Sequence, residues 1–511
     1  MSDSNVPPSP SGDNLFLPVP QVLLSELISE GVELGRGYPA ILRSIEKDQD
    51  RLGLAKKQLR AECADWLARQ TPALPGMEGE TPGSVGVSPL SGGRPRMSAE
   101  TVLVFLTVSH HFQSVYTQDG AERLVDSLAL HGYLTDRGLC LPGARTIGDN
   151  VNALSEDTLG LILRCQLQLV QAEGLDNFVE LCGDSTACEA NAEHPTDSRL
   201  ILRFLERAAR AGAKLSQFGV PDFRSFRTPQ WLKELHKLDF QINVAKNKRE
   251  RKKLYRQYLK VAGKLLGRLW EEAKRAGEAG GPADPNPILL ARRTRCWNQI
   301  VDDLTEACHI HGRCAERMLD GKSRKGAHRI LSIADEAAAW IAKGNRIAVI
   351  GYKPQLARSG NGFVSALLVP EGNAADSAML LPLVREAVGN TGVTPRLASF
   401  DDGYTSERNH EGLAELKVKD ISFSGSKALK LLGEEAYADP ILAEARSDRS
   451  AVESLMFCLK HVHGFGRLRR RGIAAVRAEL TGKVIVYNMR RAIMLRKAKP
   501  EPEQESDPVA A

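Results

Sequence analysis

The chain has 511 residues, 42% of them hydrophobic and 26% charged, which is the balance of a soluble globular protein with a substantial buried core. Lys and Arg outnumber Asp and Glu by 69 to 63, so the net charge of +6 permits a nucleic-acid partner without requiring one. The nine cysteines contain no Cys-x-x-Cys pair, and neither a signal peptide nor a bilayer-length apolar run is visible. These features argue against a disulfide scaffold, a secreted protein and a membrane protein, and predict a cytoplasmic location.

The N-terminal third is predicted to be helical. Residues 1–70 hold a disordered lead and a small helical module, and residues 71–97 are rich in Pro, Gly and Ser, as a flexible linker is. Residues 98–175 begin at Ser98, a predicted N-cap, and contain a Pro-Gly turn followed by a short helix, Ala144 to Val151. This pattern is typical of a helix-turn-helix DNA-binding region, although a plain helical bundle fits it equally well.

A first acid follows the predicted strand at Val179 to Thr186. Apolar and polar residues alternate there, and Gly183, Asp184 and Ser185 come at its end. A carboxylate held at the exposed end of a strand is a natural metal ligand, although an Asp in that position is more often a turn former.

Residues 199–329 are predicted to form a basic helical insertion. The densest cluster of positive charge contains the candidate phosphate contacts Lys248, Arg249, Arg251, Lys252 and Lys253. A solvated helix face is an equal alternative. Four residues in the same insertion could be imagined as a zinc set, but their spacing matches no usual pattern and buried helical cysteines explain them better: Cys296, Cys308, His311 and Cys314.

Strand patterns return after residue 345. Arg346 to Ala357 and Gly362 to Pro370 are predicted to pair as a hairpin, and a helix over Ser377 to Val388 is predicted to be N-capped by Asp376. A strand from Arg396 to Phe400 then ends in the second acid, Asp401, which is followed directly by Asp402. A helix capped by Ser406 and a strand over Val418 to Ser422 come next.

The third acid is Glu453, on a predicted helix from Ser447 to Gly464. At 100° per residue, Arg449, Glu453 and Lys460 fall within about 60° of arc, so one helix face carries a carboxylate between two cations. An i, i+4 pair on a solvated surface would look the same. The succession of elements nevertheless predicts an α/β fold: an RNase H-like mixed sheet, with a large helical insertion and a helical N-terminal DNA-binding region, whose three acids converge at one edge.

Three ordered motifs resemble those of bacterial insertion-sequence transposases of the DDE class. The segment from Asp184 to Ser198 resembles their first-acid segment, and the stretches Glu371 to Ser377 and Ser399 to Ser406 resemble their middle block. The spacing of Arg449, Glu453 and Lys460 is similar to the signature around their third acid. Two positions depart from the family pattern: Arg446 stands where the signature has Tyr, and Asp402 stands where the family usually has Lys or Arg.

The resemblance implies an enzyme that binds the terminal repeats of its element and cleaves and transfers DNA strands. It implies two Mg²⁺ ions, replaceable by Mn²⁺, held by Asp184, Asp401 and Glu453, with Asp402 as the alternative second acid. Two divalent ions roughly 4 Å apart can activate the nucleophile and stabilise the leaving oxygen. The cationic residues Arg449, Lys460, Arg467, Arg469, Arg470 and Arg471 would contact phosphates of transposon-end and target DNA.

The resemblance also implies a homodimer that pairs two DNA ends in the cytoplasm, associated with the nucleoid, and no membrane partner. The catalytic domain would comprise residues 176–198 and 330–495, and residues 496–511 are expected to be a disordered tail. Two alternatives use the same fold. One is a catalytically inactive, transposase-derived DNA-binding protein, and the other is a structure-specific nuclease.

Overall fold

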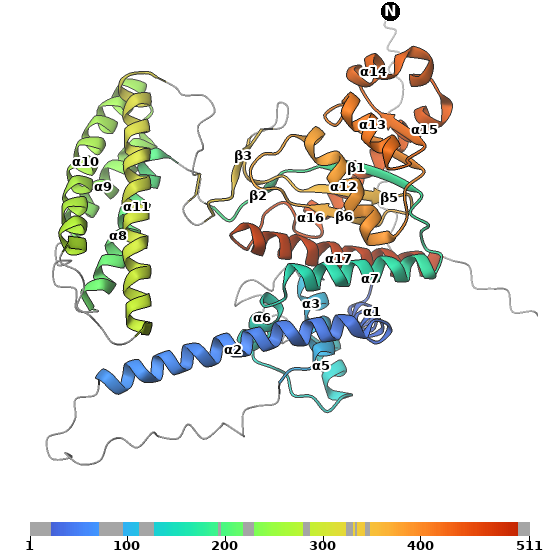
Figure 1. Cartoon of the computed structure of the whole chain (residues 1–511), viewed down its shortest axis with the longest axis horizontal. Coiled ribbons are helices and arrows are strands. Elements are labelled where there is room, and N and C mark those ends of the chain that lie inside the picture. The colour runs from blue at the N-terminus through green and yellow to red at the C-terminus, as the bar shows by residue number, and fades with distance from the viewer. Residues whose placement is uncertain are drawn as a thin grey trace, which may run out of the picture. The chain divides into compact units, whose positions relative to one another are not determined.

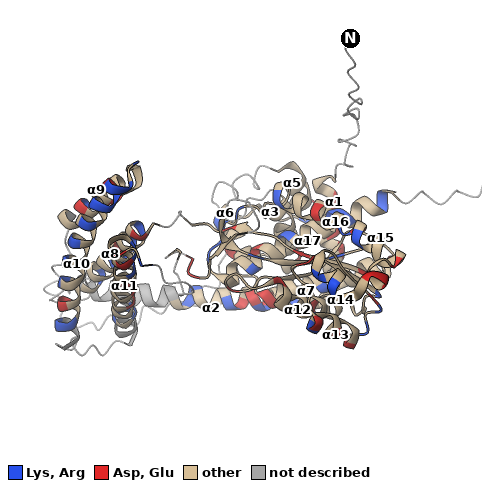
Figure 2. Ribbon diagram, turned by 90° about the horizontal axis from the view of Figure 1, so that it is seen from above, with Lys and Arg blue, Asp and Glu red and all other residues tan. Residues whose placement is uncertain are grey.

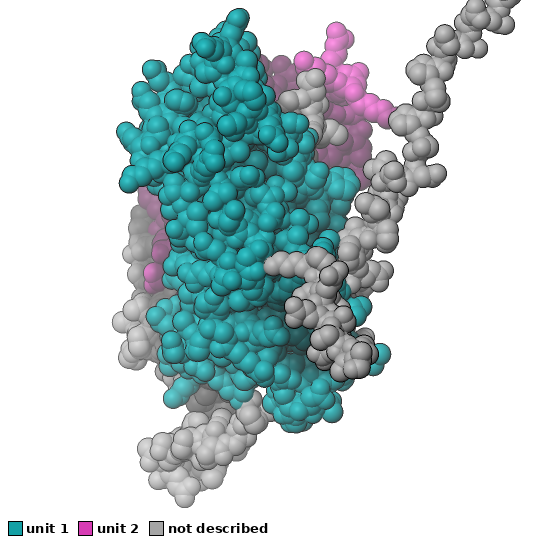
Figure 3. All heavy atoms as spheres, turned by 90° about the vertical axis from the view of Figure 1, so that its right-hand side faces the viewer, with its two compact units in different colours: residues 1–59, 71–188, 353–511 teal, residues 60–70, 189–352 magenta. Residues whose placement is uncertain are grey.

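The computed structural model describes residues 22–70, 96–111, 127–192, 196–217, 229–278, 287–322, 331–332, 335–342 and 348–498. The chain divides into two compact units, coloured separately in Figure 3. Unit 1 comprises residues 1–59, 71–188 and 353–511, and unit 2 comprises residues 60–70 and 189–352. The predicted disordered lead at residues 1–14 and nearly all of the predicted linker lie outside the described residues, as does the tail from residue 499.

Unit 1 is built on a five-stranded mixed sheet with the order β6-β5-β1-β7-β8. Its strands are β1 (Glu180–Ser185), β5 (Gln355–Ser359), β6 (Val364–Leu368), β7 (Leu397–Phe400) and β8 (Asp420–Phe423). β1 is antiparallel to β5 and parallel to β7, which is in turn parallel to β8. This topology confirms the predicted α/β fold with an RNase H-like mixed sheet.

One face of the sheet is covered by α12 (Asp376–Thr391), with α13 (Glu407–Glu415) beside it (Figure 1). The helix contributes an apolar stripe that packs on inward-facing strand residues, among them Leu181, Ala398 and Phe400. Because alternate residues of a strand face opposite sides, Asp184 points away from this core while Ser185 points towards α12.

Further helices cover the remaining parts of the sheet. α15 (Pro440–Asp448) packs on β7 and β8, where Ser399 and Ser422 donate hydrogen bonds to the carbonyls of Ala445 and Leu442. α16 (Ser450–His461) packs on β1, and α14 (Ser426–Tyr437) follows β8. α17 (Ile473–Ala498) lies along the edge strand β6, where the Asn488 side chain pairs with both backbone groups of Val364 and so protects the sheet edge.

The described N-terminal helices are α1 (Leu24–Gly37), α2 (Pro39–Gln70), α3 (Ala99–His111), α5 (Leu128–Thr135), α6 (Ala144–Asn152) and α7 (Glu156–Ala172), all in unit 1 except residues 60–70 of α2. α3 is buried almost all round because it packs against α1, α6 and α17. Ser98 accepts a hydrogen bond from the Thr101 amide, as its predicted N-cap role requires. The helix α6 occupies the predicted recognition segment, and its role in DNA binding stays a prediction.

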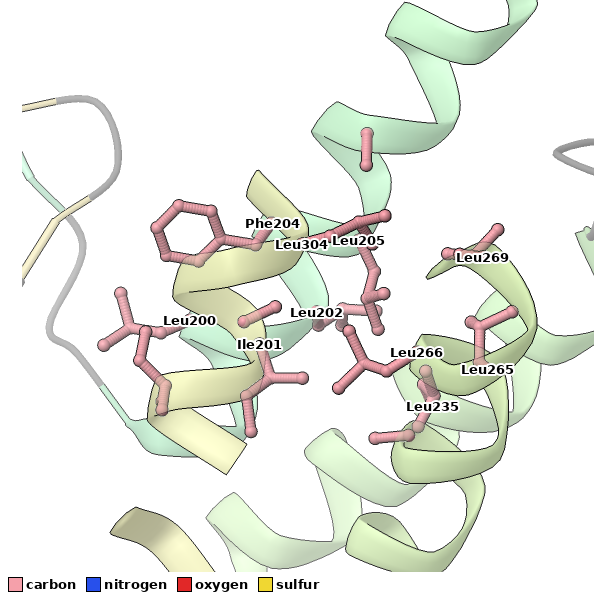
Figure 4. Close-up of a cluster of buried hydrophobic side chains, with 14 of the residues drawn as sticks. Leu200, Ile201, Leu202, Phe204, Leu205, Leu235, Leu265, Leu266, Leu269 and Leu304 are labelled. Carbon is pink, nitrogen blue, oxygen red and sulfur yellow. The ribbon is translucent and has the colours of Figure 1, made fainter. Parts of the chain in front are cut away.

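Unit 2 is mainly a helical bundle of α8 (Asp197–Gln217), α9 (Pro229–Val244), α10 (Lys248–Glu278) and α11 (Pro287–Leu319). Leucines from all four helices interlock in its core (Figure 4). Figure 2 shows Lys and Arg distributed along α9 and α10. A small sheet with the order β2-β4-β3 is formed by β2 (Cys188–Glu189), β4 (Val349–Tyr352) and β3 (Ala339–Ile341).

Three local predictions were wrong in detail. The strand expected over Arg346 to Ala357 is divided at Lys353 and Pro354 into β4 and β5, which belong to different sheets, because Pro lacks the amide that a continuous ladder needs. Asp376 is the first residue of α12, not its N-cap, which is Ala375. The helix expected from Ser447 to Gly464 is interrupted at Arg449, the junction of α15 and α16.

The C-terminal helix also extends further than expected. α17 continues to Ala498, so the first three residues of the predicted tail are helical, and one of them, Arg496, pairs with Glu30 and Glu173. Within the described ranges, no helix combines the length and the apolar character needed to cross a bilayer.

Candidate catalytic site

Asp184 and Asp401 lie at the same edge of the sheet. β1 and β7 are parallel neighbours, and Gly183 is the register partner of Phe400, so the residue after each of them is one of the two acids. Gly183 is required for this pairing, because a Cβ at that position would lie 2.3 Å from the Phe400 ring. Two carboxylates that the sequence separates by more than 200 residues are thereby brought together.

Asp184 differs from its prediction in one respect. It lies within β1, and its side chain is only 12% exposed, whereas an exposed position after the strand was expected. The strand continues through Ser185 because β5 pairs with it as far as Gln355. The Ser185 amide donates a 2.6 Å hydrogen bond to Oδ1 of Asp184, which fixes the direction of the carboxylate.

The adjacent acids Asp401 and Asp402 point in different directions. Oδ1 of Asp401 accepts a 2.9 Å hydrogen bond from the Gly403 amide. Oδ1 of Asp402 accepts a 2.9 Å bond from the Lys427 amide in the first turn of α14, and the Lys427 ammonium lies 3.9 Å from Oδ2. The Asp402 carboxylate therefore serves the start of α14, which favours Asp401 as the acid beside Asp184.

Glu453 reaches the site through Arg449. The guanidinium of Arg449 lies 3.9 Å from Oδ2 of Asp184 and 3.6 Å from Oε1 of Glu453, so it bridges the first and third acids. Glu453 is 68% exposed, and solvent therefore screens its half of the bridge. Nε of Arg449 is buried and has no hydrogen-bond partner among the residues that the structure describes, so this guanidinium is only partly satisfied there.

Arg446 stands where the resembled signature has a Tyr. Its guanidinium lies 4.0 Å from the centre of the Tyr437 ring and donates a hydrogen bond to the Tyr437 carbonyl. Arg446 therefore joins α15 to α14 rather than facing Asp184. This departure from the family pattern has a structural role of its own.

The carboxylates suit a hard divalent cation in chemistry but only partly in placement. Oxygen ligands of this type are what Mg²⁺ binds. Asp184 and Asp401 are adjacent, yet Arg449 occupies the space between Asp184 and Glu453. Among the described residues, no group of three His, Cys, Asp or Glu side chains is close enough to hold a metal ion. A site with three acids therefore requires Arg449 and Glu453 to move.

A hydrogen-bonded network that the sequence analysis did not identify lies beside the two acids. Oδ1 of Asp376 is 2.8 Å from the Lys353 ammonium and 2.9 Å from Nε2 of Gln355. The Tyr404 hydroxyl donates to Oε1 of Gln355, and Ser185 hydrogen-bonds with both Asp376 and Tyr404. The sequence predicts an N-cap role for Asp376 and a motif from Glu371 to Ser377, but no local pattern pairs Asp376 with a lysine 23 residues earlier.

Burial and charge both act on this network. Burial raises the pKa of Tyr404, and the carboxylates of Asp376, Asp184 and Asp401 raise it further, so the phenol stays protonated and donates. Burial alone would raise the pKa of Asp376, but hydrogen bonds from Lys353 and Gln355 outweigh it and hold the pKa below its usual value. Asp376 is therefore an anion paired with Lys353.

The predicted DNA-binding cations are placed in three groups. Lys460 is half-buried on α16, on the same helix as Glu453. Arg467, Arg469 and Arg471 are exposed and Arg470 is half-buried in the loop between α16 and α17, called the basic loop below. In unit 2, Lys248, Arg249 and Lys253 are exposed at the start of α10. Arg251 and Lys252 instead donate to the carbonyls of Ala245 and Leu319, so both take part in the packing of the bundle.

A buried carboxylate holds the basic loop. Glu479 of α17 accepts hydrogen bonds from the backbone amides of Arg469 and Arg470, at 2.8 to 3.2 Å. Its side chain is fully buried and pairs with Lys483, which also donates to the Gly464 carbonyl. The Glu479 carboxylate in the protein interior thereby fixes the backbone of the loop, while the guanidinium groups of the loop lie at the surface.

The residues considered as a zinc set do not form a metal site among the described residues. Trp270 donates to the Cys308 sulfur, and His311 is 2.8 Å from the Leu259 carbonyl. Cys314 is fully buried, and burial raises the pKa of its thiol. The three cysteines, Cys296, Cys308 and Cys314, belong to the helical core of unit 2, where small apolar side chains are common.

Residues 316–489 match the family model described as "Transposase DDE domain". The matched stretch contains Asp401, Asp402 and Glu453 and every strand of the large sheet except β1. It supports a transposase role, and with it a DNA substrate and the divalent ions that such domains typically use. The match begins near the end of α11, after most of unit 2, so Asp184 joins the matched acids only through the sheet topology. No curated protein and no solved structure matches the chain.

Proposed function

We propose that this chain is the transposase of a bacterial insertion sequence, which binds the terminal repeats of its element and catalyses DNA strand cleavage and strand transfer. The observation that carries the proposal is the placement of Asp184 and Asp401 at the same end of two neighbouring parallel strands, β1 and β7, with Glu453 joined to Asp184 through Arg449. The match to the transposase DDE domain supports the same reaction class.

In this proposal Asp184, Asp401 and Glu453 would hold two Mg²⁺ ions, for which Mn²⁺ can substitute. Bound there, the ions would lower the pKa of the attacking hydroxyl or water and stabilise the leaving 3′-oxygen. The chain's own cations have a separate task. Arg449 and Lys460 would bind phosphates beside the cleaved bond, since a guanidinium prefers a bidentate phosphate oxygen pair to the long contacts it makes here.

The basic loop would bind the DNA backbone further from the cleaved bond. Arg467, Arg469, Arg470 and Arg471 present four guanidinium groups on a backbone fixed by Glu479. The exposed cations of α10 are a second candidate phosphate surface, Lys248, Arg249 and Lys253. We further propose a homodimer that pairs two transposon ends with target DNA in the bacterial cytoplasm, associated with the nucleoid.

Strand cleavage of DNA that carries the terminal repeats flanking the gene tests the proposal. Cleavage at the repeat ends should require Mg²⁺ or Mn²⁺, and Asp184→Ala, Asp401→Ala and Glu453→Ala should each lower its rate by at least about 1000-fold, the scale of losing a group that acts in the transition state. Asp402→Ala is the matched control, because its carboxylate faces α14, and it should keep most of the wild-type rate.

Each other result favours a different function. Binding of the ends without any cleavage would support the inactive transposase-derived DNA-binding protein. Cleavage without preference for the repeats would support the structure-specific nuclease of the same fold. A loss of cleavage in Asp402→Ala but not in Asp401→Ala would exchange the roles of the two acids.

A further inference from the structure

We propose that the Lys353–Asp376 ion pair belongs to the catalytic site, where Asp376 keeps the Lys353 ammonium away from Asp184 and Asp401 and so preserves their affinity for a divalent cation. This inference rests on the proposed function and adds a charge-controlling pair to the acids of that site. Lys353 lies two residues before β5 and Asp376 is the first residue of α12, so neither belongs to the three acids considered so far.

The pair is built into the edge of the sheet that carries the acids. Gln355, two residues after Lys353, is the register partner of Ser185, the residue next to Asp184. A Cβ placed on Gly403 would lie 3.1 Å from Oδ1 of Asp401 and 3.5 Å from Oδ2 of Asp376, so both carboxylates approach the same point. Asp184, Asp376 and Asp401 all act electrostatically on the Tyr404 hydroxyl.

Lys353 is held firmly by its partners. Its side chain is 12% exposed and that of Asp376 is 17% exposed, so water screens their charges poorly. The ammonium contacts Oδ1 of Asp376 at 2.8 Å and the Ala374 carbonyl at 3.1 Å, both at the start of α12. The N-terminus of a helix also favours the negative charge of Asp376.

The proposal therefore predicts that removing the charge of Asp376 and removing the charge of Lys353 change the affinity for a divalent cation in opposite directions. Without the Asp376 charge, Lys353 would be an uncompensated cation at the sheet edge that carries Asp184 and Asp401, and would lower the affinity of these carboxylates for a divalent ion. Without the Lys353 charge, Asp376 would add a negative charge and attract that ion. A pair that served only to stabilise the fold would not produce opposite effects, because either loss would damage the site in the same direction.

The experiment measures Mn²⁺ binding to the full chain without DNA, by the electron paramagnetic resonance of free Mn²⁺. The variants are Asp376→Asn, Lys353→Met and the double variant, and thermal unfolding of each is followed alongside. Asp376→Asn should weaken Mn²⁺ binding about tenfold, the effect of one charge across a partly buried site, while Lys353→Met should leave it unchanged or tighter. The double variant should return to within about threefold of the wild type, because the two charge changes cancel.

A matched control lies at the opposite edge of the large sheet from Asp401. Arg396 and Asp420 form a 3.0 Å ion pair where β7 and β8 begin, away from the acids, so Asp420→Asn should leave Mn²⁺ binding unchanged. Equal weakening by Asp376→Asn and Lys353→Met, or an unchanged affinity in Asp376→Asn, would overturn the inference.

A second reference separates this inference from the proposed function. The variant Asp184→Asn/Asp401→Asn should abolish the Mn²⁺ binding that Asp376→Asn weakens. If it leaves binding unchanged, the metal site of the proposed function is itself wrong, and the inference that rests on it fails as well. If it abolishes binding while the sign test fails, only the role of Lys353 and Asp376 is refuted.

Discussion

At the scale of single residues, the site depends on glycines that allow close approach. Gly183 lets the Phe400 ring lie against β1, and Phe400 in turn packs on Tyr404, with 5.3 Å between the ring centres. Gly403 similarly leaves room for Asp401 and Asp376. A methyl group at either position would have to displace a ring or a carboxylate of the site.

Gly183→Ala tests this packing. The new Cβ would lie 2.3 Å from the Phe400 ring, so the free energy of unfolding should fall by about 1–3 kcal/mol, as measured by urea denaturation of the full chain. Gly132→Ala is the control, because its position in α5 is open and helical, and it should gain up to about 1 kcal/mol. An unchanged stability in Gly183→Ala would show that the ring moves freely.

At the scale of elements, the basic loop depends on a charge pair inside α17. Glu479 and Lys483 are one helical turn apart, and the Glu479 carboxylate also accepts hydrogen bonds from two backbone amides of the loop. A buried ion pair adds little net stability, but removing one of its two partners leaves the other as an uncompensated buried charge. The same pair therefore links the helix interior to the proposed DNA-binding surface.

Glu479→Gln should lower the free energy of unfolding by about 3 kcal/mol or more, because it leaves the Lys483 ammonium buried without its counter-charge. The double variant Glu479→Gln/Lys483→Met should recover part of that loss. Glu156→Gln is the control: its pair with Arg477 is longer, 3.8 Å, and substantially exposed, so its loss should stay within about 0.5 kcal/mol. Denaturant unfolding checks all three values, and equal losses at the two glutamates would contradict the explanation.

At the scale of the whole molecule, unit 1 encloses histidines where its N-terminal and C-terminal helices meet. His110 of α3 packs so closely on α17 that a Cβ on Gly482 would lie 2.2 Å from its ring. Burial lowers the pKa of His110 and of His463 to about 3, with further lowering from Lys483. Both imidazoles are therefore neutral in the folded protein at neutral pH.

The sign of the resulting pH dependence follows from those values. A histidine binds its proton near pH 6.5 in the unfolded chain, whereas His110 and His463 bind theirs only near pH 3 in the folded protein. Between these two pH values the unfolded state therefore binds more protons than the folded state. The free energy of unfolding falls as the pH drops below about 6.5. Each of the two histidines should lower the free energy of unfolding by roughly 1 kcal/mol when the pH falls from 7 to 5.5.

His463→Phe should therefore reduce the difference between the melting temperatures of the full chain at pH 7 and at pH 5.5. The exposed His131 of α5 supplies the matched variant, His131→Phe, which should leave that difference unchanged. The same pH dependence in His463→Phe as in the wild type would mean that other groups cause acid unfolding.

Patterns local in the sequence were enough to predict the elements and their order. Alternation over Val179 to Thr186 and the spacing around Glu453 depend only on neighbouring residues, and β1 and α16 formed there. The N-cap roles of Ser98 and Ser406 were predicted in the same way and are confirmed. The order of these elements was also enough to predict the RNase H-like sheet, since few topologies accommodate it.

Contacts between distant segments decided the rest. Only the strand order shows that Asp184 is buried beside Asp401 and that Asp402 faces α14 instead. Lys353 and Asp376, and Glu479 with the loop amides, are joined by packing that no periodicity encodes. The break at Pro354 was visible in the sequence, yet its outcome, two strands in two sheets, depended on which partners had unpaired backbone groups to offer.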